Sequence, residues 1–175
     1  MKTVTINIYQ FSELSDEAKE NAIKELYDIN VDSDWWDNTY EDAAQINLKI
    51  KGFDIDRGSY VNAEFIESAN NTAELIIMNH GESCETYKTA KSFLQDYNEL
   101  VAKYSDGVKT DRVTEDNEYD FDNEADDLEY DFLQSISEDY RIILSNEYDY
   151  LTSEKSIIET IEANEYDFTE YGQLK

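Results

Sequence analysis

Proline is absent from this sequence, and glycine is scarce, with five residues among 175. Because no proline is available to stop a helix, capping residues and glycines must set the helix ends. Cys84 is the only cysteine, which excludes an intrachain disulfide and favours a reducing compartment. No run of about 18 apolar residues occurs, and residues 1–10 alternate polar and apolar side chains, unlike a signal peptide. We therefore expect a cytoplasmic protein that is neither secreted nor inserted in a membrane.

Side chains suited to catalysis are also scarce. His80 is the only histidine, and Cys84 follows it four residues later, so a nucleophile–base pair is one alternative. No second histidine supports that pair, and the sequence has no glycine-rich phosphate loop, no nucleophile elbow and no zinc-ligand spacing. We predict that the protein is not an enzyme and that it has no cofactor and no dedicated metal site.

Basic residues are few, because 14 Lys and Arg stand against 42 Asp and Glu, which gives a net charge of −28. Low hydrophobicity with high charge is typical of disorder, but 40% hydrophobic residues, 14 Tyr and 7 Phe favour a folded protein. Residues 1–110 hold 21 acids and 10 bases, whereas residues 111–175 hold 21 acids and 4 bases. Such a field repels nucleic acid and anionic membranes and attracts proteins with basic clefts. The partner should therefore be a basic protein.

The densest negative charge coincides with the longest helical pattern, in residues 115–150. Apolar side chains recur there at steps of three and four, which predicts one helix with one buried face. That face is formed by Phe121, Ala125, Leu128, Phe132, Ile136, Tyr140 and Ile143. Carboxylates flank it on one side at Asp120, Glu124, Asp127 and Asp131, and on the other at Asp122, Asp126 and Glu129. We therefore expect two acidic rows along one helix.

Carboxylates three or four positions apart on a helix lie roughly 5–6 Å apart, comparable to neighbouring phosphates of DNA, whose duplex carries about one charge per 1.7 Å. The leading hypothesis is a DNA mimic, and the alternative is a solvated helix face. Four tyrosines of the repeated tetrapeptides would add flat amphipathic surface to a protein interface, or would close the core instead: Tyr119, Tyr130, Tyr148 and Tyr166. The predicted partner-binding residues are Glu118, Tyr119, Asp120, Asp122, Glu124, Asp126, Asp127, Glu129, Tyr130, Asp131, Glu147 and Asp149.

The same acids match several ligand positions of a calcium-binding loop that would run from Asp116 to Asp127. Phe121 occupies the position where such a loop needs glycine, and Asp127 occupies the position of the bidentate Glu. A calcium-responsive module is therefore a weaker alternative.

The rest of the chain predicts an α+β fold, in which an N-terminal strand, helices and a β-hairpin precede a helical, highly acidic C-terminal part. The alternating residues Thr3–Tyr9 predict a half-buried strand. Helices are expected to begin at Ser15 and at the caps Asp34 and Ser153, to run through Leu75, Ile76 and Met78 up to Gly81, and to carry the stripe Tyr87, Ala90, Leu94, Tyr97, Val101 and Tyr104. The expected inward residues are Ala18, Ala22, Ile23, Leu26 and Tyr27 in the first helix and Trp36, Tyr40, Ala43 and Ala44 in the second.

A β-hairpin is predicted in the middle of the sequence. The buried side changes across Gly52, which indicates a bulged or bent strand. Residues Arg57–Ser59 then form a turn into a second strand, Tyr60–Ile66. Near the end of the chain, Tyr166–Leu174 is expected to form a strand or a tail.

These patterns divide the chain into two parts. Residues 1–108 form the expected α+β domain, and residues 109–175 form the acidic helical region that packs on it or extends from it, with Ser105–Thr114 as the connection.

The tetrapeptide Glu-Tyr-Asp-Phe/Tyr recurs at residues 118–121, 129–132, 147–150 and 165–168. A shared role of these repeats and a recurrence through composition alone both remain open.

Three phrases of the sequence carry a resemblance to known proteins. They are YQFSELSDEAKENAI at Tyr9–Ile23, DWWD at Asp34–Asp37 followed by Glu41–Asp42, and GFDIDR at Gly52–Arg57. In these phrases the chain resembles proteins of Firmicutes phages and prophages. Small acidic phage proteins of this kind look like the DNA-mimic anti-defence class, which includes antirestriction and anti-CRISPR proteins. The resemblance implies an inhibitor in the host bacterial cytoplasm that occupies the DNA-binding cleft of a nuclease, such as a Cas9-type CRISPR effector or a restriction enzyme.

A function of another class is a non-enzymatic adaptor that binds proteins through surface aromatic residues around Trp35 and Trp36. In that case the acidity serves solubility, although the same tryptophan pair is also expected to anchor the core. Replacing Asp120, Glu124, Asp127 and Asp131 with amides separates the two hypotheses, because only the mimic depends on these charges. The oligomeric state stays open, with a homodimer as one alternative.

Overall fold

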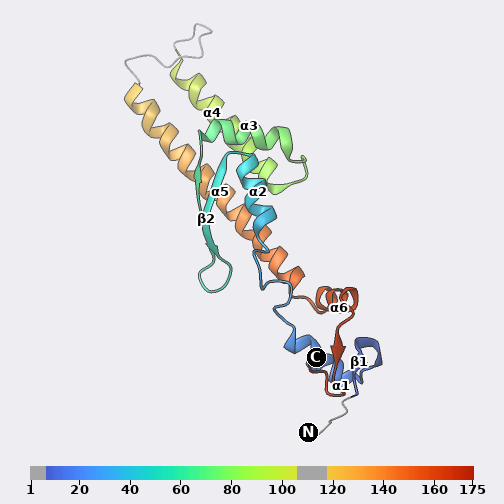
Figure 1. Cartoon of the computed structure of the whole chain (residues 1–175). Coiled ribbons are helices and arrows are strands. Elements are labelled where there is room, and N and C mark those ends of the chain that lie inside the picture. The colour runs from blue at the N-terminus through green and yellow to red at the C-terminus, as the bar shows by residue number, and fades with distance from the viewer. Residues whose placement is uncertain (1–6, 106–117) are drawn as a thin grey trace. The chain divides into compact units, whose positions relative to one another are not determined.

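The computed structural model describes residues 7–105 and 118–175 (Figure 1). Contacts divide the chain into two compact units, and each unit is described here by itself. Unit 1 holds residues up to Trp35 together with Ser145–Lys175, and unit 2 holds Trp36–Leu144. The expected boundary between residues 108 and 109 lies outside the described residues, as do most of the expected strand Thr3–Tyr9 and most of the expected connection.

Unit 1 joins the beginning of the chain to its end. Its elements are β1 (Tyr9–Gln10), the 3₁₀ helix η1 (Phe11–Glu13), α1 (Asp16–Glu25), α6 (Glu154–Ala163) and β4 (Asp167–Phe168). Strand β1 pairs antiparallel with β4, so that Tyr9 lies opposite Phe168. The core of this unit is formed by Phe11, Leu14, Ala18, Ala22, Ile157, Ile161 and Phe168. The C-terminal stretch therefore contains a strand, and Phe168 also bridges to Leu174.

Serine caps begin both longer helices of unit 1, as predicted. The Ser15 hydroxyl accepts a hydrogen bond from the Ala18 N–H, and the Ser153 hydroxyl accepts one from the Ser156 N–H. Each cap satisfies a backbone donor that the first helical turn leaves unpaired. The expectation that Tyr27 faces inward is wrong, because α1 ends at Glu25 and the Tyr27 side chain is exposed.

Unit 2 contains the β-hairpin and the longest helices. Its elements are α2 (Asp37–Gln45), β2 (Leu48–Asp54), β3 (Tyr60–Phe65), α3 (Ala69–Asn79), α4 (Glu85–Tyr104) and most of α5 (Glu118–Leu151). Its buried core is formed by Ala43, Ile46, Leu48, Ile50, Ala69, Ala73, Ile76, Ala90, Phe93, Phe132, Ile136 and Tyr140. Helices and an antiparallel hairpin thus share one core, and the predicted α+β class is confirmed.

The predicted hairpin is confirmed together with its irregularity. Strands β2 and β3 pair antiparallel, and the register shifts between Ile50 and Gly52, which is the signature of a bulge. The turn contains Gly58 at a φ of 82°, a left-handed conformation that glycine adopts without steric cost. Phe65 on β3 stacks against Phe132 of α5, with ring centroids 5.6 Å apart. The hairpin is therefore fastened to α5 by an aromatic contact.

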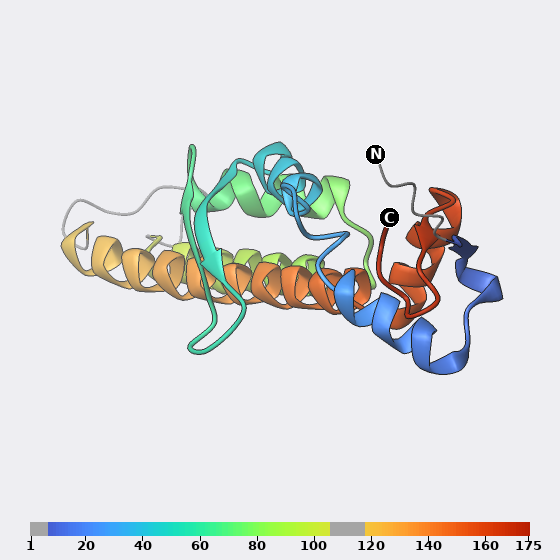
Figure 2. The same cartoon turned by 60° about the horizontal axis from the view of Figure 1, so that its bottom comes forward.

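Helices α4 and α5 lie side by side in opposite directions (Figures 1 and 2). Near the start of α4, the Thr89 hydroxyl donates a hydrogen bond to Asp139. In the middle of the helix, the rings of Phe93 and Phe132 stack with centroids 4.4 Å apart. At the end of α4, the Tyr104 ring meets Phe121 edge-on, with centroids 5.9 Å apart. Because the partners on α5 fall in number as those on α4 rise, the pair is antiparallel, and its apolar stripes face each other.

The structure corrects the expected start of α2. The predicted cap Asp34 is exposed, and the helix begins at Asp37 after Trp36, which makes no side-chain cap. The Trp36 ring instead packs edge-on against Phe53, with centroids 5.6 Å apart. Packing of an aromatic ring therefore positions this helix start, and a capping carboxylate does not. Ala44 is exposed as well, in contrast to the inward position expected for it.

Helix α3 runs through Met78 as predicted, and the Met78 side chain is 78% exposed. Two further expectations about helices α3 and α5 are wrong in detail. Helix α3 ends at Asn79 with His80 as its C-cap, so Gly81 follows the end without forming it. On α5 the buried position after Tyr140 is Leu144, at 0% exposure, whereas Ile143 is 39% exposed. The buried residues Phe132, Ile136, Tyr140 and Leu144 thus follow one another in steps of four.

Candidate functional site

The candidate site is the acidic segment, which we define as residues 118–131 of α5. Phe121, Ala125 and Leu128 turn this part of the helix toward the core of unit 2, and Ala125 is buried. The predicted acids Asp120, Asp122, Glu124, Asp126, Asp127 and Asp131 are all exposed. Glu118 is the first described residue of α5, and its side chain lies outside the described residues. The two flanks expected from the sequence thus reach solvent on either side of a buried stripe.

The acidic segment carries charge at a density close to that of a nucleic acid. Eight acids and no base occupy its 14 residues. A helix of this length measures about 21 Å, which gives about one negative charge per 2.6 Å of axis, against about one per 1.7 Å for duplex DNA. One helix therefore reaches more than half of the charge density of a duplex.

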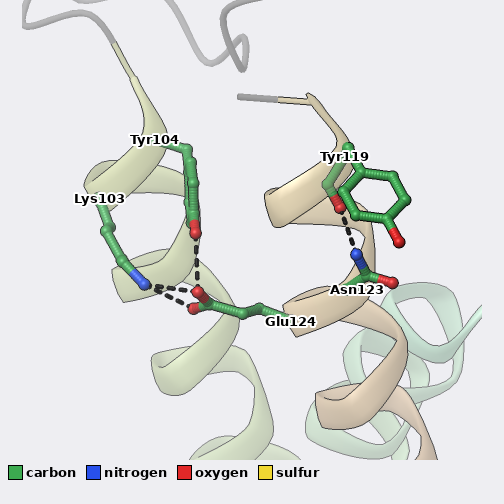
Figure 3. A network of polar contacts seen from close by, with 5 residues as sticks. All are labelled: Lys103, Tyr104, Tyr119, Asn123 and Glu124. Carbon is green, nitrogen blue, oxygen red and sulfur yellow. Dashed lines mark hydrogen bonds and ion pairs between the residues drawn. The ribbon is translucent and has the colours of Figure 1, made fainter. Parts of the chain in front are cut away.

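Two tyrosines lie on the outer face of the acidic segment. Tyr119 is 79% exposed and Tyr130 is 62% exposed. They are eleven residues apart, which is close to three helical turns and places them on one side of α5. Near Tyr119, the Asn123 side chain donates a hydrogen bond to the Tyr119 carbonyl oxygen at 2.7 Å (Figure 3). Exposed tyrosines next to carboxylates suit a protein interface, where aromatic residues contribute much of the binding energy.

Glu124 differs from the other acids because the protein itself neutralises it. The Lys103 ammonium donates to both Glu124 carboxylate oxygens at 2.7 Å, and the Tyr104 hydroxyl donates to one of them at 2.7 Å (Figure 3). These hydrogen bonds, that from Lys103 above all, hold the pKa of the Glu124 carboxyl below its usual value. Glu124 therefore connects α5 to α4, and its charge is less available to a partner than the sequence alone suggests.

Glu129 is the most enclosed acid of the segment, with a half-buried side chain. Burial, together with the negative charge of Asp126, raises the pKa of the Glu129 carboxyl. A carboxylate that is already partly dehydrated and repelled gains more from a partner's cation than a fully hydrated one. The Glu129 carboxyl therefore favours its neutral form more than a free glutamate does, and a partner's cation would offset that effect.

Sequence reasoning missed two acids on α4 that the fold brings to the segment. Asp96 and Glu99 of α4 face Asp127 and Asp131 of α5 across a groove of about 560 Å³, with Leu100 and Leu128 also in its lining. We call it the α4–α5 groove. Residues 96 and 99 are three positions apart on the polar side of a predicted helix, so their spacing was visible in the sequence. Their position beside α5 was not, because it depends on how the two helices pack.

The predicted residues Glu147 and Asp149 belong to unit 1, whereas the acidic segment belongs to unit 2. Between them, Tyr148 is half-buried and packs against Trp35, with ring centroids 5.7 Å apart. Asp149 is exposed and Glu147 is half-buried. These two acids therefore form a separate feature of unit 1.

The four tetrapeptide repeats do not occupy equivalent positions. Their tyrosines are exposed at Tyr119 and Tyr130 but half-buried at Tyr148 and Tyr166. Their last residues range from buried at Phe132 and Phe168 to exposed at Tyr150. The first three repeats lie in α5, and the fourth leads into β4. A common role is therefore limited to the two exposed tyrosines of the acidic segment.

The sequence suggested two alternative sites, a His80–Cys84 pair and a calcium-binding loop. His80 does not pair with Cys84, because its Nδ1 lies 2.8 Å from the Thr86 hydroxyl and its Nε2 lies 3.6 Å from Asp42. The weaker alternative of a calcium loop is wrong in its described part, since residues from Glu118 onward are helical and cannot wrap around an ion. Within residues 7–105 and 118–175, no group of three or more His, Cys, Asp or Glu side chains is arranged to hold a metal ion.

The two tryptophans of the adaptor hypothesis each pack against another aromatic ring. Trp35 and Trp36 are both half-buried, Trp35 against Tyr148 in unit 1 and Trp36 against Phe53 in unit 2. Neither belongs to the fully buried core, so the expectation that the pair anchors one core is wrong.

No protein-family model, characterised protein or solved structure matches this chain. In the part of the chain that the structure describes, no helix combines the length and the apolar character needed to cross a membrane. Function must accordingly be inferred from the charge, exposure and packing of the residues above.

Proposed function

We propose that the protein is a phage-encoded anti-defence inhibitor that mimics DNA. In this proposal the acidic segment occupies the basic nucleic-acid cleft of a host nuclease, such as a Cas9-type CRISPR effector or a restriction enzyme. The inhibitor acts in the host bacterial cytoplasm, binds no nucleic acid itself and catalyses no reaction. The observation that carries the proposal is the run of six exposed carboxylates on a regular helix, in a segment that holds eight acids and no base among 14 residues.

The physical basis is competition for the same cations. A nuclease holds DNA largely through Lys and Arg contacts to phosphates, and an ordered array of carboxylates offers those side chains an alternative anion. A helix fixes the spacing of the array, so little conformational entropy is lost when the array binds. The exposed rings of Tyr119 and Tyr130 add contact area that bare charge does not provide.

A competition experiment tests the proposal. A panel of purified nucleases, including a Cas9-type effector and restriction enzymes, is mixed with fluorescently labelled target duplex and increasing amounts of the protein. Mimicry predicts that the duplex is released from at least one nuclease as the protein binds. It also predicts weaker binding as NaCl rises, because the Debye length falls from about 10 Å at 0.1 M to about 3 Å at 1 M. A nuclease that is inhibited while it keeps its DNA would contradict mimicry.

A charge-matched pair of variants makes the test specific. Asp120→Asn, Asp122→Asn and Asp126→Asn together remove three charges from the exposed flanks of the segment and should weaken binding about tenfold, at a few tenths to 1 kcal/mol for each exposed pair. Glu41→Gln, Glu67→Gln and Glu74→Gln together remove three exposed charges elsewhere in unit 2 and should leave binding nearly unchanged. An adaptor that binds through aromatic residues would tolerate both triple variants equally.

A further inference from the structure

The α4–α5 groove continues beyond the hollow beside Lys103. A second hollow of about 320 Å³ lies along the same helix pair, and both hollows are lined by Asp96, Leu128 and Asp131. Because the two share these residues, they form one groove that follows the seam between the helices. The groove extends from the Lys103–Glu124 contact at least to the buried ring of Phe132.

The groove combines an apolar floor with an acidic rim. Its floor includes the buried side chains of Phe93, Leu100 and Phe132. Its rim includes the exposed carboxylates of Asp96 and Glu99 from α4 and of Asp127 and Asp131 from α5. Among the described residues, no Lys, Arg or His pairs with Asp96, Asp127 or Asp131. Apart from Lys103 at one end, no described Lys, Arg or His lines either hollow, so carboxylates from the two helices face one another over hydrocarbon.

At one end of the groove, the Lys103 ammonium already occupies the kind of position that a partner's cation could occupy along the rest of the groove. The Lys103 ammonium contacts the Glu124 carboxylate of the opposite helix and lies 4.8 Å from the centre of the Tyr104 ring. This intramolecular contact combines a carboxylate with an aromatic surface, and both stabilise a cation. Since Glu124 compensates the Lys103 charge, the lysine leaves the neighbouring rim acidic.

We propose that the α4–α5 groove binds arginine side chains of the basic partner. Arginine fits this groove better than lysine because its guanidinium is planar and weakly hydrated, packs on apolar and aromatic surfaces, and binds a carboxylate with two parallel hydrogen bonds. Its aliphatic stem covers the leucines of the floor while the head reaches the rim. The inference deepens the proposed function and rests on it, since the arginines are those with which the nuclease would hold DNA.

A peptide experiment tests the groove without any nuclease. Hexa-arginine and hexa-lysine peptides are titrated into the full chain at 50 mM NaCl, with affinity measured by calorimetry and the contact surface by backbone amide NMR shifts. We expect hexa-arginine to bind more tightly than hexa-lysine and the largest shifts to fall on residues 96–100 and 127–131. Equal affinity for the two peptides, or shifts spread evenly over all acidic surfaces, would overturn the inference.

Two triple variants with the same charge change complete the test. Asp96→Asn, Asp127→Asn and Asp131→Asn together should weaken hexa-arginine binding about tenfold or more. Glu41→Gln, Glu67→Gln and Glu74→Gln together should weaken it less than about threefold, because long-range attraction changes equally in both. Circular dichroism confirms that each variant is folded. Equal affinities of the two variants would show that net charge, and not the groove, attracts the peptide.

Failure of this inference can be told apart from failure of the proposed function. If hexa-arginine binds the groove but no nuclease releases its DNA, the groove stands and DNA mimicry falls. If a nuclease is inhibited and the Asp96, Asp127 and Asp131 variant inhibits as well as the wild type, mimicry stands and the groove inference is overturned.

Discussion

The Asp42 side chain of α2 connects helices of unit 2 through its polar contacts with Tyr140 and His80. The hydroxyl of Tyr140, which is fully buried, donates a hydrogen bond to Asp42 Oδ2 at 2.6 Å, and His80 Nε2 lies 3.6 Å from Asp42 Oδ1. Burial above all, with the neighbouring negative charges, raises the pKa of the Tyr140 hydroxyl, so the tyrosine remains a donor. His80 also contacts the Thr86 hydroxyl. The residue that the sequence suggested as a catalytic base is therefore part of a structural network.

Among the described glycines, Gly172 is the one where an added methyl group should destabilise the protein most. It has a φ of 82°, and a Cβ there would lie 2.0 Å from the Ala18 carbonyl oxygen of α1. Gly172→Ala should destabilise the protein by more than about 2 kcal/mol, because the left-handed conformation costs about 1–2 kcal/mol and the backbone of α1 must also move. Urea-induced unfolding, followed by circular dichroism, measures the change.

Gly58 is the matched control for this prediction. It has the same φ of 82°, but nothing lies within 4 Å of its Cβ position. Gly58→Ala should therefore cost only the conformational term of about 1–2 kcal/mol. Equal destabilisation by the two substitutions would mean that the close approach to Ala18 is unimportant.

Asp139 should make stability depend on pH. Burial raises the pKa of its carboxyl more than the hydrogen bond from Thr89 lowers it, and the charges of Glu85 and Glu138 raise it further. A raised folded-state pKa means that the folded protein binds the proton more tightly, so the stability due to this group is greatest below the usual value of 3.8 and is lost as pH rises through the folded value. Asp139→Asn should therefore stabilise the protein at pH 7, by less than about 1 kcal/mol because the group is only half-buried.

The pH dependence of this gain separates it from a general charge effect. Glu67→Gln removes one exposed negative charge from the same unit and serves as the control. Urea unfolding of both variants at pH 7 and at pH 4.5 should give a larger gain for Asp139→Asn at pH 7, and the difference should shrink at pH 4.5. A constant difference between the two variants would contradict a titrating Asp139.

Between elements, the antiparallel contact of α4 and α5 determines the candidate site. Aromatic contacts of Phe93 with Phe132 and of Tyr104 with Phe121 align the two helices. That alignment places α4 acids opposite α5 acids along the groove. Like charges are thereby brought together by apolar packing, which offsets their repulsion because buried aromatic area stabilises more than exposed charges destabilise.

The Lys103–Glu124 contact should control how firmly the first turns of α5 are held. Glu124→Gln leaves one acceptor oxygen and no charge, so amides of residues 119–128 should exchange hydrogen several-fold faster, most clearly at low salt. Hydrogen exchange with mass spectrometry measures the rates. Asp122→Asn is the control, because Asp122 is exposed and makes no hydrogen bond or ion pair with another described residue. If both variants exchange alike, the contact does not hold the helix.

Across the whole molecule, electrostatic repulsion opposes folding, because 42 acids face only 14 bases. The ion pairs among the described residues mostly join exposed side chains, such as Lys24 with Glu20 and Lys155 with Glu159. Exposed pairs of this kind contribute little. The net charge therefore decides whether added salt stabilises or destabilises the folded protein.

Salt should stabilise this protein. Raising NaCl from 10 to 500 mM shortens the Debye length from about 30 Å to well below 10 Å, and the repulsion among unpaired acids weakens more than the few ion pairs do. The melting temperature should rise by several degrees, as measured by circular dichroism or calorimetry. KCl at equal ionic strength should act alike, because screening is not specific to one cation. A fall in melting temperature would show that attractive pairs dominate.

Local patterns in the sequence determined most helices, the hairpin and the acidic segment. Apolar steps of three and four along α4 and α5, serine caps at Ser15 and Ser153, and the change of face at Gly52 all act within a few residues. Such signals are readable because they depend on helix period, backbone donors and strand alternation, which neighbouring residues fix by themselves.

Only the tertiary structure decided which distant segments meet. It joined residues up to Trp35 with Ser145–Lys175 in one unit. It placed Asp96 and Glu99 beside the acidic segment and paired Glu124 with Lys103. It also buried Leu144, where the sequence predicted Ile143. Each of these outcomes depends on the register between elements that are far apart in the chain. Register arises from the packing of whole apolar faces, and a pattern read along one segment holds no information about the segment that will cover it.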